Sequence, residues 1–177
     1  MEASVKQIIK AFGEILTSVT CNRGEVIHQS NARCNKIFIV QSGVLRSYYF
    51  REGKDITAHF AMDYSIIGAV DSLLRQTTSI YSIEALEKSK ILVMEYSEME
   101  LFLDKNPRLE RLARQVSQWL YLDLVERLEG MMFLSAEERY SHLLNRYPNI
   151  TQKVNLGYIA SYLGITQETL SRIRKSR

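Results

Sequence analysis

The sequence predicts an α+β fold, in which an antiparallel β-sandwich or barrel is followed by a long helix and then by a pair of short helices. Three observations carry this prediction. Between residues 25 and 96, short apolar segments alternate with turn residues about every ten positions, the rhythm of antiparallel strands. Beyond residue 96 the apolar residues recur at the spacing of helices. Residues 151–177 hold five basic side chains against one acidic, a net charge of +4, whereas residues 1–150 carry −1.

The composition excludes several classes of protein. The 177 residues are 46% hydrophobic with a net charge of +3, as in a folded globular chain. Two cysteines, Cys21 and Cys34, are too few for a disulfide scaffold, a four-thiolate zinc site or a cysteine-ligated iron–sulfur cluster. No apolar run approaches the ~20 residues of a membrane span, and the charged N-terminus is unlike a signal peptide. We therefore expect a cytoplasmic protein that does not contact a membrane.

The first half of the chain is predicted to hold one helix and seven strands. Residues 1–17 have the apolar spacing of a helix that packs on the flank of the β-region. The pairs Ser42-Gly43 and Glu52-Gly53 predict hairpin turns, because glycine adopts the positive φ that such turns require. The predicted strands are 25–28, 36–41, 44–50, 55–61, 65–67, 80–85 and 90–96.

A long helix is predicted over 107–128, after a short helix that begins near Ser97. Neither proline nor glycine interrupts it after Pro107, and Gly130 is expected to end it. Its apolar stripe has the spacing with which a helix packs against a second copy of itself, or docks on its own domain. The candidate dimerisation residues are Leu109, Leu112, Val116, Trp119 and Leu120, with Leu124 and Leu128 further along the stripe.

The C-terminal segment has the pattern of a helix-turn-helix. The capping-box pair Ser135 and Glu138 opens a helix that ends before Pro148. Two shorter helices, 156–163 and 167–175, are separated by Gly164, which can take the left-handed conformation of a tight turn. The outer face of the last helix is polar and basic, as expected of a helix that enters the major groove of DNA.

The run 166–173, Thr-Gln-Glu-Thr-Leu-Ser-Arg-Ile, resembles the recognition helix of the Crp/Fnr superfamily of bacterial transcription regulators. The resemblance implies a jelly-roll barrel and a Glu-x-x-Ser-Arg motif that reads base edges, here Glu168, Ser171 and Arg172. Chemistry supports these roles independently, because arginine donates to guanine O6 and N7 and glutamate accepts from cytosine N4. Family members commonly continue into a wing of two strands, which we expect to be absent or truncated here. The full set of expected DNA contacts is Thr166, Gln167, Glu168, Thr169, Ser171, Arg172 and Lys175.

The same resemblance implies a nucleotide-binding loop, and this sequence departs from it. The family places a glutamate on the ribose and an arginine on the cyclic phosphate. Gly68 is retained here, but Ala69 stands at the glutamate position and Ser79 at the arginine position. Control by cyclic AMP is therefore not expected. Asp71 and Arg75 complete, with Gly68, a weak candidate ligand pocket.

Other sites have little support in the sequence. His28, His59 and His142 lack the spacing of metal or haem ligands, so no cofactor and no metal is expected. Cys21 and Cys34 form a redox pair only if the fold brings them together. The aromatic residues of the β-region are core residues or, alternatively, the lining of an apolar pocket.

Three domains follow from these patterns: a barrel over 1–106, a dimerisation helix over 107–130 and a helix-turn-helix unit over 131–177. The predicted function is that of a non-enzymatic transcription regulator that binds a DNA palindrome as a homodimer, with RNA polymerase and an unknown effector as further candidate partners. A degenerate barrel module acting through a protein partner is the alternative. A cupin-like enzyme would need clustered metal ligands, which the sequence does not show.

Overall fold

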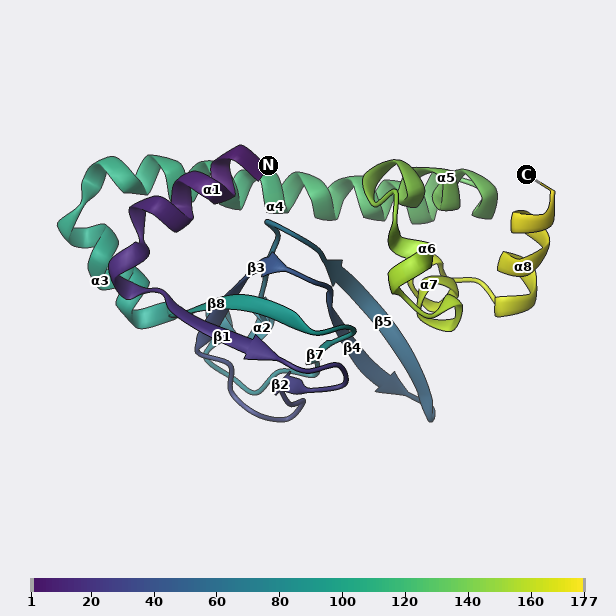
Figure 1. Cartoon of the computed structure of the whole chain (residues 1–177), viewed down its shortest axis with the longest axis horizontal. Helices are drawn as coiled ribbons and strands as arrows, with labels where there is room; N and C mark the ends of the chain where they lie inside the picture. The colour runs from purple at the N-terminus through teal and green to yellow at the C-terminus, as the bar shows by residue number, and fades with distance from the viewer. Residues whose placement is uncertain (1, 177) are drawn as a thin grey trace.

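The computed structural model describes residues 2–176, and a barrel and a helical C-terminal unit lie along one long helix (Figure 1). Met1 and Arg177, the predicted ends of the first helix and of the basic tail, lie outside the described residues. The strands are β1 (Thr17–Cys21), β2 (Val26–His28), β3 (Lys36–Ser42), β4 (Leu45–Arg51), β5 (Lys54–Ala61), β6 (Ile66–Ile67), β7 (Ser82–Ala85) and β8 (Ser89–Glu95). The helices are α1 (Glu2–Ala11), α2 (Val70–Arg75), α3 (Tyr96–Lys105), α4 (Pro107–Phe133), α5 (Ala136–Arg146), α6 (Ile150–Lys153), α7 (Leu156–Leu163) and α8 (Gln167–Lys175), with a 3-10 turn at η1 (Gly13–Ile15).

Two four-stranded antiparallel sheets form the barrel. One has the order β1-β8-β3-β6 and the other β2-β7-β4-β5. Alternate side chains of both sheets meet in a core that includes Phe38, Leu45 and Ile83, each at most 3% exposed. The predicted antiparallel barrel is confirmed, and each predicted strand lies within two residues of an observed one.

The two predicted hairpins have different outcomes. Glu52 and Gly53, both at positive φ, join β4 to β5 as a tight hairpin turn. Ser42-Gly43 is not a hairpin turn, because β3 and β4 belong to different sheets. Gly43, at φ 111°, comes so close to β8 that a Cβ would lie 2.8 Å from the Cα of Ser89. Glycine is needed there for a passage between sheets.

Near the N-terminus the predicted helix is too long. α1 ends at Ala11, and β1 pairs with β8 from Thr17 onward. The β-branched residues Thr17, Val19 and Thr20 favour a strand, and they outweigh the helical spacing that continues to residue 16. α3 likewise begins at Tyr96, before the predicted cap at Ser97.

Two further helical features differ from prediction. α2 forms in a segment expected to be a loop. α4 continues through Gly130 to Phe133, although Gly130 was expected to end it. A helix tolerates an interior glycine at a cost of about 1 kcal/mol relative to alanine. The Gly130 carbonyl still accepts the helical hydrogen bond from the Leu134 N–H.

The N-terminal half of α4 packs on its own barrel domain. Val116 is 4% exposed and lies in a cluster with Val5 and Phe12 of the N-terminal segment and with Leu92 of β8. Leu109, Leu112 and Leu120 pack against the same cluster. This stripe therefore docks within the chain, the second of the two interpretations of its spacing.

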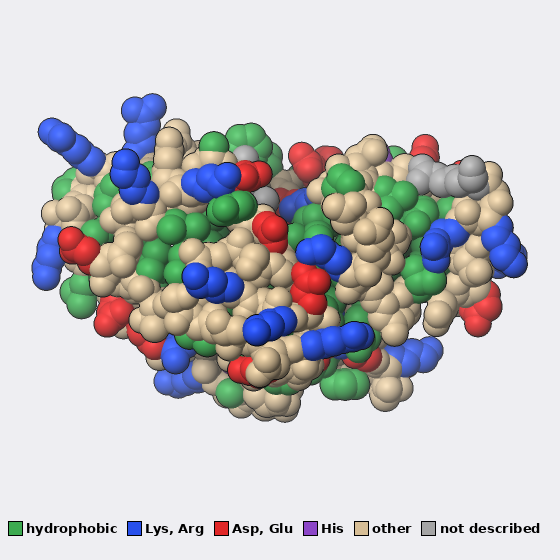
Figure 2. All heavy atoms as spheres, viewed as in Figure 1, with side chains coloured by type: hydrophobic (Ala, Val, Ile, Leu, Met, Phe, Trp, Pro, Cys, Tyr) green, Lys and Arg blue, Asp and Glu red, His purple; other side chains and the backbone are tan. Residues whose placement is uncertain are grey.

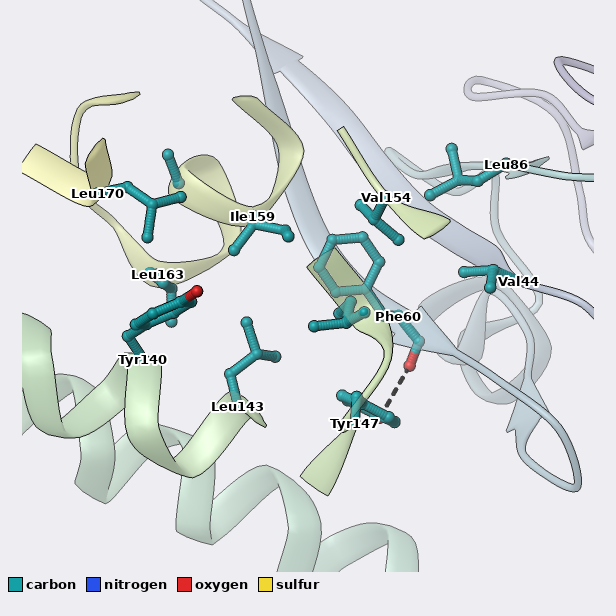
Figure 3. Close-up of a cluster of buried hydrophobic side chains, with 12 residues drawn as sticks. Val44, Phe60, Leu86, Tyr140, Leu143, Tyr147, Val154, Ile159, Leu163 and Leu170 are labelled. Carbon is teal, nitrogen blue, oxygen red and sulfur yellow. Dashed lines mark hydrogen bonds between the residues drawn. The ribbon is translucent and has the colours of Figure 1, made fainter. Parts of the chain in front are cut away.

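A separate cluster joins the barrel to the C-terminal helices. Val44, Phe60 and Leu86 come from the barrel side and pack against side chains of α5 to α8 (Figure 3). The Tyr147 hydroxyl donates to the Phe60 carbonyl at 3.2 Å, as the dashed line marks. The barrel and the C-terminal unit thus share one apolar core.

Candidate functional site

α7 and α8 form the helix-turn-helix with the bounds that the sequence predicts. Gly164 ends α7 at φ 67°, in the left-handed region. It also lies under α4, since a Cβ at this position would meet Met131 Cε at 2.8 Å. The left-handed conformation favours glycine here, whereas the methionine side chain can move aside, so Gly164 is needed for the turn between the two helices.

The N-terminus of α8 is capped as predicted. The Thr166 hydroxyl accepts a hydrogen bond from the Thr169 N–H at 3.2 Å. The side chains of Thr166 and Thr169 are themselves hydrogen bonded at 3.1 Å. On the inner side, Leu170 is fully buried against the cluster that contains Ile159 and Leu163. Burial of Leu170 sets which face of α8 points outward.

That outward face carries the residues predicted to contact DNA. Gln167, Glu168, Ser171, Arg172 and Lys175 are all exposed. The structure thus brings all five to one surface at the end of the molecule, where Figure 2 shows Lys and Arg side chains beside an acidic one, as also elsewhere on this face. Thr166 is exposed and Thr169 half-buried at the same end of the helix.

Electrostatics on this face suit hydrogen bonding to bases. A bond from its own backbone N–H and one from Thr166 lower the pKa of the Glu168 carboxyl, and nearby Arg172 acts in the same direction. Glu168 is therefore an ionised acceptor near neutral pH. Arg172 Nη2 lies 3.4 Å from Thr169 Oγ1, so its remaining N–H groups are free for a ligand. Lys153, counted in the basic tail, instead pairs with Glu87 of the barrel side at 2.8 Å.

A buried arginine connects the barrel with α7. Arg46 of β4 is 2% exposed and pairs with Asp55 and Glu84, each at 2.6 Å. Its guanidinium also lies 3.6 Å from the ring centroid of Tyr158 on α7. The charge is thus compensated by two carboxylates and covered by an aromatic ring. Nothing in the sequence spacing identified this contact.

Ser161 of α7 completes the junction at the edge of the sheet. β5 is an edge strand, so some of its backbone groups lack a strand partner. The Ser161 hydroxyl accepts from the Thr57 N–H at 3.0 Å and donates to the Asp55 carbonyl at 3.2 Å. Phe60 and Tyr162 are in ring contact beside it, with centroids 5.1 Å apart. The helix-turn-helix is therefore seated on β5.

The predicted ligand loop is closed by its own side chains. Both carboxylate oxygens of Asp71 accept from the Ser79 hydroxyl, at 2.8 and 3.0 Å, and the Ile80 N–H points to the same carboxylate at 3.4 Å. Ala69 is buried and has no polar side-chain atom. Gly68 lies just after β6, and Arg75 is exposed at the end of α2. The Asp71–Ser79 pair was missed because Asp71 lies in the first turn of α2, a helix that was not predicted, and Ser79 follows that helix.

The remaining candidates are dispersed. Cys21 and Cys34 are both buried free thiols, and Cys34 Sγ donates to the Lys36 carbonyl. Within residues 2–176, no three His, Cys, Asp or Glu side chains are placed to share a metal ion. Burial lowers the pKa of His28, whose Nε2 has no hydrogen-bond partner in this part of the chain. No helix in the described range is long and apolar enough to cross a membrane.

The predicted dimerisation residues divide into two groups. Val116 is buried within its own chain, and Leu109, Leu112 and Leu120 are partly covered there. The prediction that these residues form a free surface for a second chain is therefore corrected. Trp119 is 50% exposed. The exposed apolar stripe of α4 lies further toward its C-terminus. We call it the α4 stripe, and its members are Tyr121, Leu124, Leu128 and Met132.

Comparison with known proteins places this architecture. Residues 18–106 match the model of the cyclic nucleotide-binding domain. The chain is 27% identical over 166 residues to electron transport regulator A of Shewanella oneidensis, an alignment that covers 85% of this chain and 64% of that protein's own length.

Solved structures show the same fold. FixK2 of Bradyrhizobium japonicum has a TM-score of 0.73 and 18% identity, covering 92% of this chain and 84% of that one. A transcriptional regulator of the Crp/Fnr family from Eubacterium rectale, itself assigned by similarity, has a TM-score of 0.70 and 21% identity, covering 94% and 80%. The chain therefore belongs to the cyclic nucleotide-binding domain family.

Proposed function

We propose that this protein is a DNA-binding transcription regulator that acts as a homodimer in the cytoplasm. The observation that carries the proposal is the outward face of α8, where Glu168, Ser171 and Arg172 are exposed while Leu170 of the same helix is fully buried. A helix anchored on one side and polar on the other can lie in a major groove without losing its own packing. The relatives named above are regulators, which supports the same role.

Two kinds of DNA contact are expected from α8. Arg172 and Glu168 are the base readers, toward guanine and cytosine, with Ser171 and Gln167 beside them. Thr166, Thr169 and Lys175 are assigned to phosphates, which position the helix without specifying sequence. The three domains, 1–106, 107–130 and 131–177, then correspond to the barrel, the dimer helix and the DNA reader.

The α4 stripe is the proposed dimer contact. Leu128 is 58% and Tyr121 66% exposed, and the stripe repeats at the spacing of a two-helix coiled coil. Two copies paired through it would present two α8 helices to a palindrome, with half-sites about one helical turn, or ~34 Å, apart. Trp119, a member of the predicted dimerisation set, lies about two and a half helical turns from Leu128 and therefore faces away from this contact.

Binding to a fluorescent pool of random duplexes, followed by anisotropy at several salt concentrations, tests the DNA proposal. Affinity should fall steeply with salt, and Lys175→Gln should reduce the slope by about 1 because one phosphate contact is lost. Lys54→Gln, on the exposed β4-β5 turn, is the matched control and should leave the slope unchanged. Absence of binding at low salt would contradict the proposal.

Sedimentation velocity tests the dimer separately. Leu128→Asp places a charge in the α4 stripe and should convert a dimer to a monomer. Leu101→Asp, at a similarly exposed leucine of α3, should leave the dimer intact. A Leu128→Asp protein that still sediments as a dimer would place the contact elsewhere.

The barrel is proposed not to respond to cyclic AMP. Ala69 offers no acceptor for a ribose hydroxyl, and Asp71 places a negative charge beside Ser79, where the family binds a phosphate. A like charge at that position repels the nucleotide. An effector of other chemistry, and a contact with RNA polymerase, remain parts of the proposal without a residue assigned to them.

The alternative function is a degenerate barrel module that acts through a protein partner. The buried junction between α7 and β5 favours this alternative, because the junction holds the helix-turn-helix against the barrel. An intact dimer without any DNA binding in the two experiments above would favour this alternative.

A further inference from the structure

A cavity of about 550 Å³ lies where α4, α5 and the end of α7 meet. Its apolar walls include Trp119 and Leu122 of α4, Leu134 after that helix, and Leu143 of α5. Its volume is within the range of about 300–1,000 Å³ that is usual for small-molecule sites. The cavity is separate from the barrel interior and from the outward face of α8.

Three guanidinium groups line this cavity. Arg146 is paired with Asp123 on the facing helix. Arg127 stacks on the Tyr162 ring, 4.1 Å from its centroid, and Arg139 donates to the carbonyls of Leu134 and Leu163. Among residues 2–176, neither Arg127 nor Arg139 has a carboxylate at ion-pair distance. Two cations in the cavity wall are therefore held by carbonyls and rings rather than by ion pairs, and the carboxylates that line the same cavity are Asp123, paired with Arg146, and Glu126.

The positive charge of these arginines also affects the pKa of a neighbouring histidine, His59. Burial lowers the pKa of His59 on β5 to about 4, and the charges of Arg146 and Arg127 add to the effect. Burial, the larger cause, penalises a charge of either sign, so only the contributions of Arg146 and Arg127 indicate a positive potential, and that potential favours a negative group. The apolar walls at the same time favour a ligand with a hydrophobic body.

We propose that this cavity binds a small amphipathic carboxylate, whose acidic group meets Arg127 and Arg139 and whose apolar body lies against Trp119 and Leu122. Arginine suits this role, because its fixed fork donates two parallel hydrogen bonds to a carboxylate. The occupant would touch both the long helix and the end of α7.

The cavity and the proposed dimer contact lie on different sides of α4. Trp119 and Leu128 are nine residues apart, which is about two and a half helical turns, so they face opposite directions. Gly130, which lines the cavity, is likewise nine residues from Tyr121 of the α4 stripe. Pairing of two chains through the stripe thus leaves the cavity open.

Trp119 makes the site directly measurable, because it is the chain's single tryptophan. The probe is 1-pyrenebutyrate, which absorbs where tryptophan emits, and 1-pyrenebutanol is a neutral probe with the same apolar body. Titration of the whole chain with each probe, followed by quenching of Trp119 emission, gives two dissociation constants. The carboxylate should bind at least about tenfold more tightly, as expected for one charge-assisted contact.

Three variants locate the binding. Arg127→Gln should abolish the preference for the carboxylate, whereas Arg111→Gln, an exposed arginine of the same helix, should retain it. Gly130→Leu fills the cavity without removing a charge, and should abolish binding of both probes. The Cβ itself has room, with Leu134 Cδ1 at 3.8 Å, and leucine is the better helix former, so this variant should fold.

Two results would overturn the proposal. Equal affinity for the acid and the alcohol would show that the arginines do not recognise the carboxylate. Unchanged binding in both Arg127→Gln and Gly130→Leu would place the probe on another apolar surface, such as the α4 stripe. The experiment contains no DNA, so its outcome is independent of the proposed function.

Discussion

α8 and the loop around α2 lie at two positions where Crp/Fnr chains carry a functional motif, and they use their polar groups in opposite ways. On α8, Glu168 and Arg172 point outward and are exposed. Around α2, the Asp71 carboxylate is engaged by Ser79 and directed inward. In the same fold, the polar groups of α8 are thus available to a partner, whereas those of the α2 loop are hydrogen bonded within the chain.

The fold determines where each site lies, and individual side chains determine whether the site is open. A recognition helix needs only local features: a cap at Thr166, a buried Leu170 and a polar outer face. A ligand loop needs groups left unpaired, and here Ser79 is already paired within the chain.

The largest effect is expected at the Arg46 contact, which joins the barrel to the helix-turn-helix. Arg46→Ala leaves Asp55 and Glu84 without their shared cation and removes the stacking on Tyr158. Loss of one partner from a buried ion pair costs about 3–5 kcal/mol. The free energy of unfolding, measured with urea, should fall by that amount.

Arg51→Ala is the control for this change, because Arg51 lies on the same strand with its side chain 75% exposed. Its effect should be within about 0.5 kcal/mol. If Arg46→Ala costs no more than Arg51→Ala, the seat of α7 on β5 depends on the apolar cluster and the Ser161 hydrogen bonds rather than on Arg46.

The second effect concerns the open motif. Arg172→Ala should weaken binding to the selected DNA site by about 1–3 kcal/mol and relax the base preference at one position of each half-site. Arg75→Ala, at the exposed end of α2, should change neither quantity. Competition binding against duplexes substituted at single positions measures both. An unchanged base preference in Arg172→Ala would remove its role as a base reader.

The third effect is on acid stability, through a histidine that faces the junction. The pKa of His59 in the folded chain is about 4, against 6.5 as its ordinary value. The unfolded chain therefore binds a proton first, so stability is complete above pH 6.5 and decreases as the pH falls toward 4. At about 1.4 kcal/mol per pKa unit, the loss is on the order of 1–3 kcal/mol.

His59→Gln removes that contribution, and its unfolding free energy should vary less between pH 7 and pH 4.5 than that of the parent chain. The lowered pKa of His28 acts in the same direction and is present in both proteins. Parallel pH profiles of the two proteins would show that the pKa of His59 is the same in the folded and the unfolded chain.

The smallest expected effect is none at all, and it concerns the closed motif. Cyclic AMP should leave the melting temperature unchanged, because Ala69 and Asp71 provide neither the ribose acceptor nor a phosphate donor. Differential scanning fluorimetry against rising nucleotide concentration measures this. A saturable rise in melting temperature at micromolar nucleotide would show that the loop opens.

Sequence patterns predict best those parts of the molecule that local chemistry determines. The bounds of α7 and α8, the Thr166 cap and the Ser135–Glu138 capping box are confirmed, since each depends on a few neighbouring residues. The antiparallel strands are confirmed for the same reason. Their grouping into sheets was less predictable, and Ser42-Gly43 shows why: a turn between strands and a passage between sheets look alike in sequence.

Features that depend on distant contacts could not be predicted. The helical stripe that contains Val116 has the same spacing whether it packs on α1 or on a second chain, and only the fold shows that α1 covers it. The Arg46 junction joins residues more than 100 positions apart, β4 with Tyr158 of α7, and no spacing rule reaches that far. Gly130 was expected to end α4, but the helix continues through it to Phe133, and the Gly130 carbonyl accepts from the Leu134 N–H.

Base reading by α8 is tested by selection of bound duplexes from a random DNA pool with the purified chain. We expect enrichment of an inverted repeat whose half-sites are about one helical turn apart, because two outward α8 helices read them. Arg172→Ala should enrich a repeat with one relaxed position per half-site. Recovery of sequences without any shared motif, whose binding weakens as the salt concentration rises, would contradict base reading by α8.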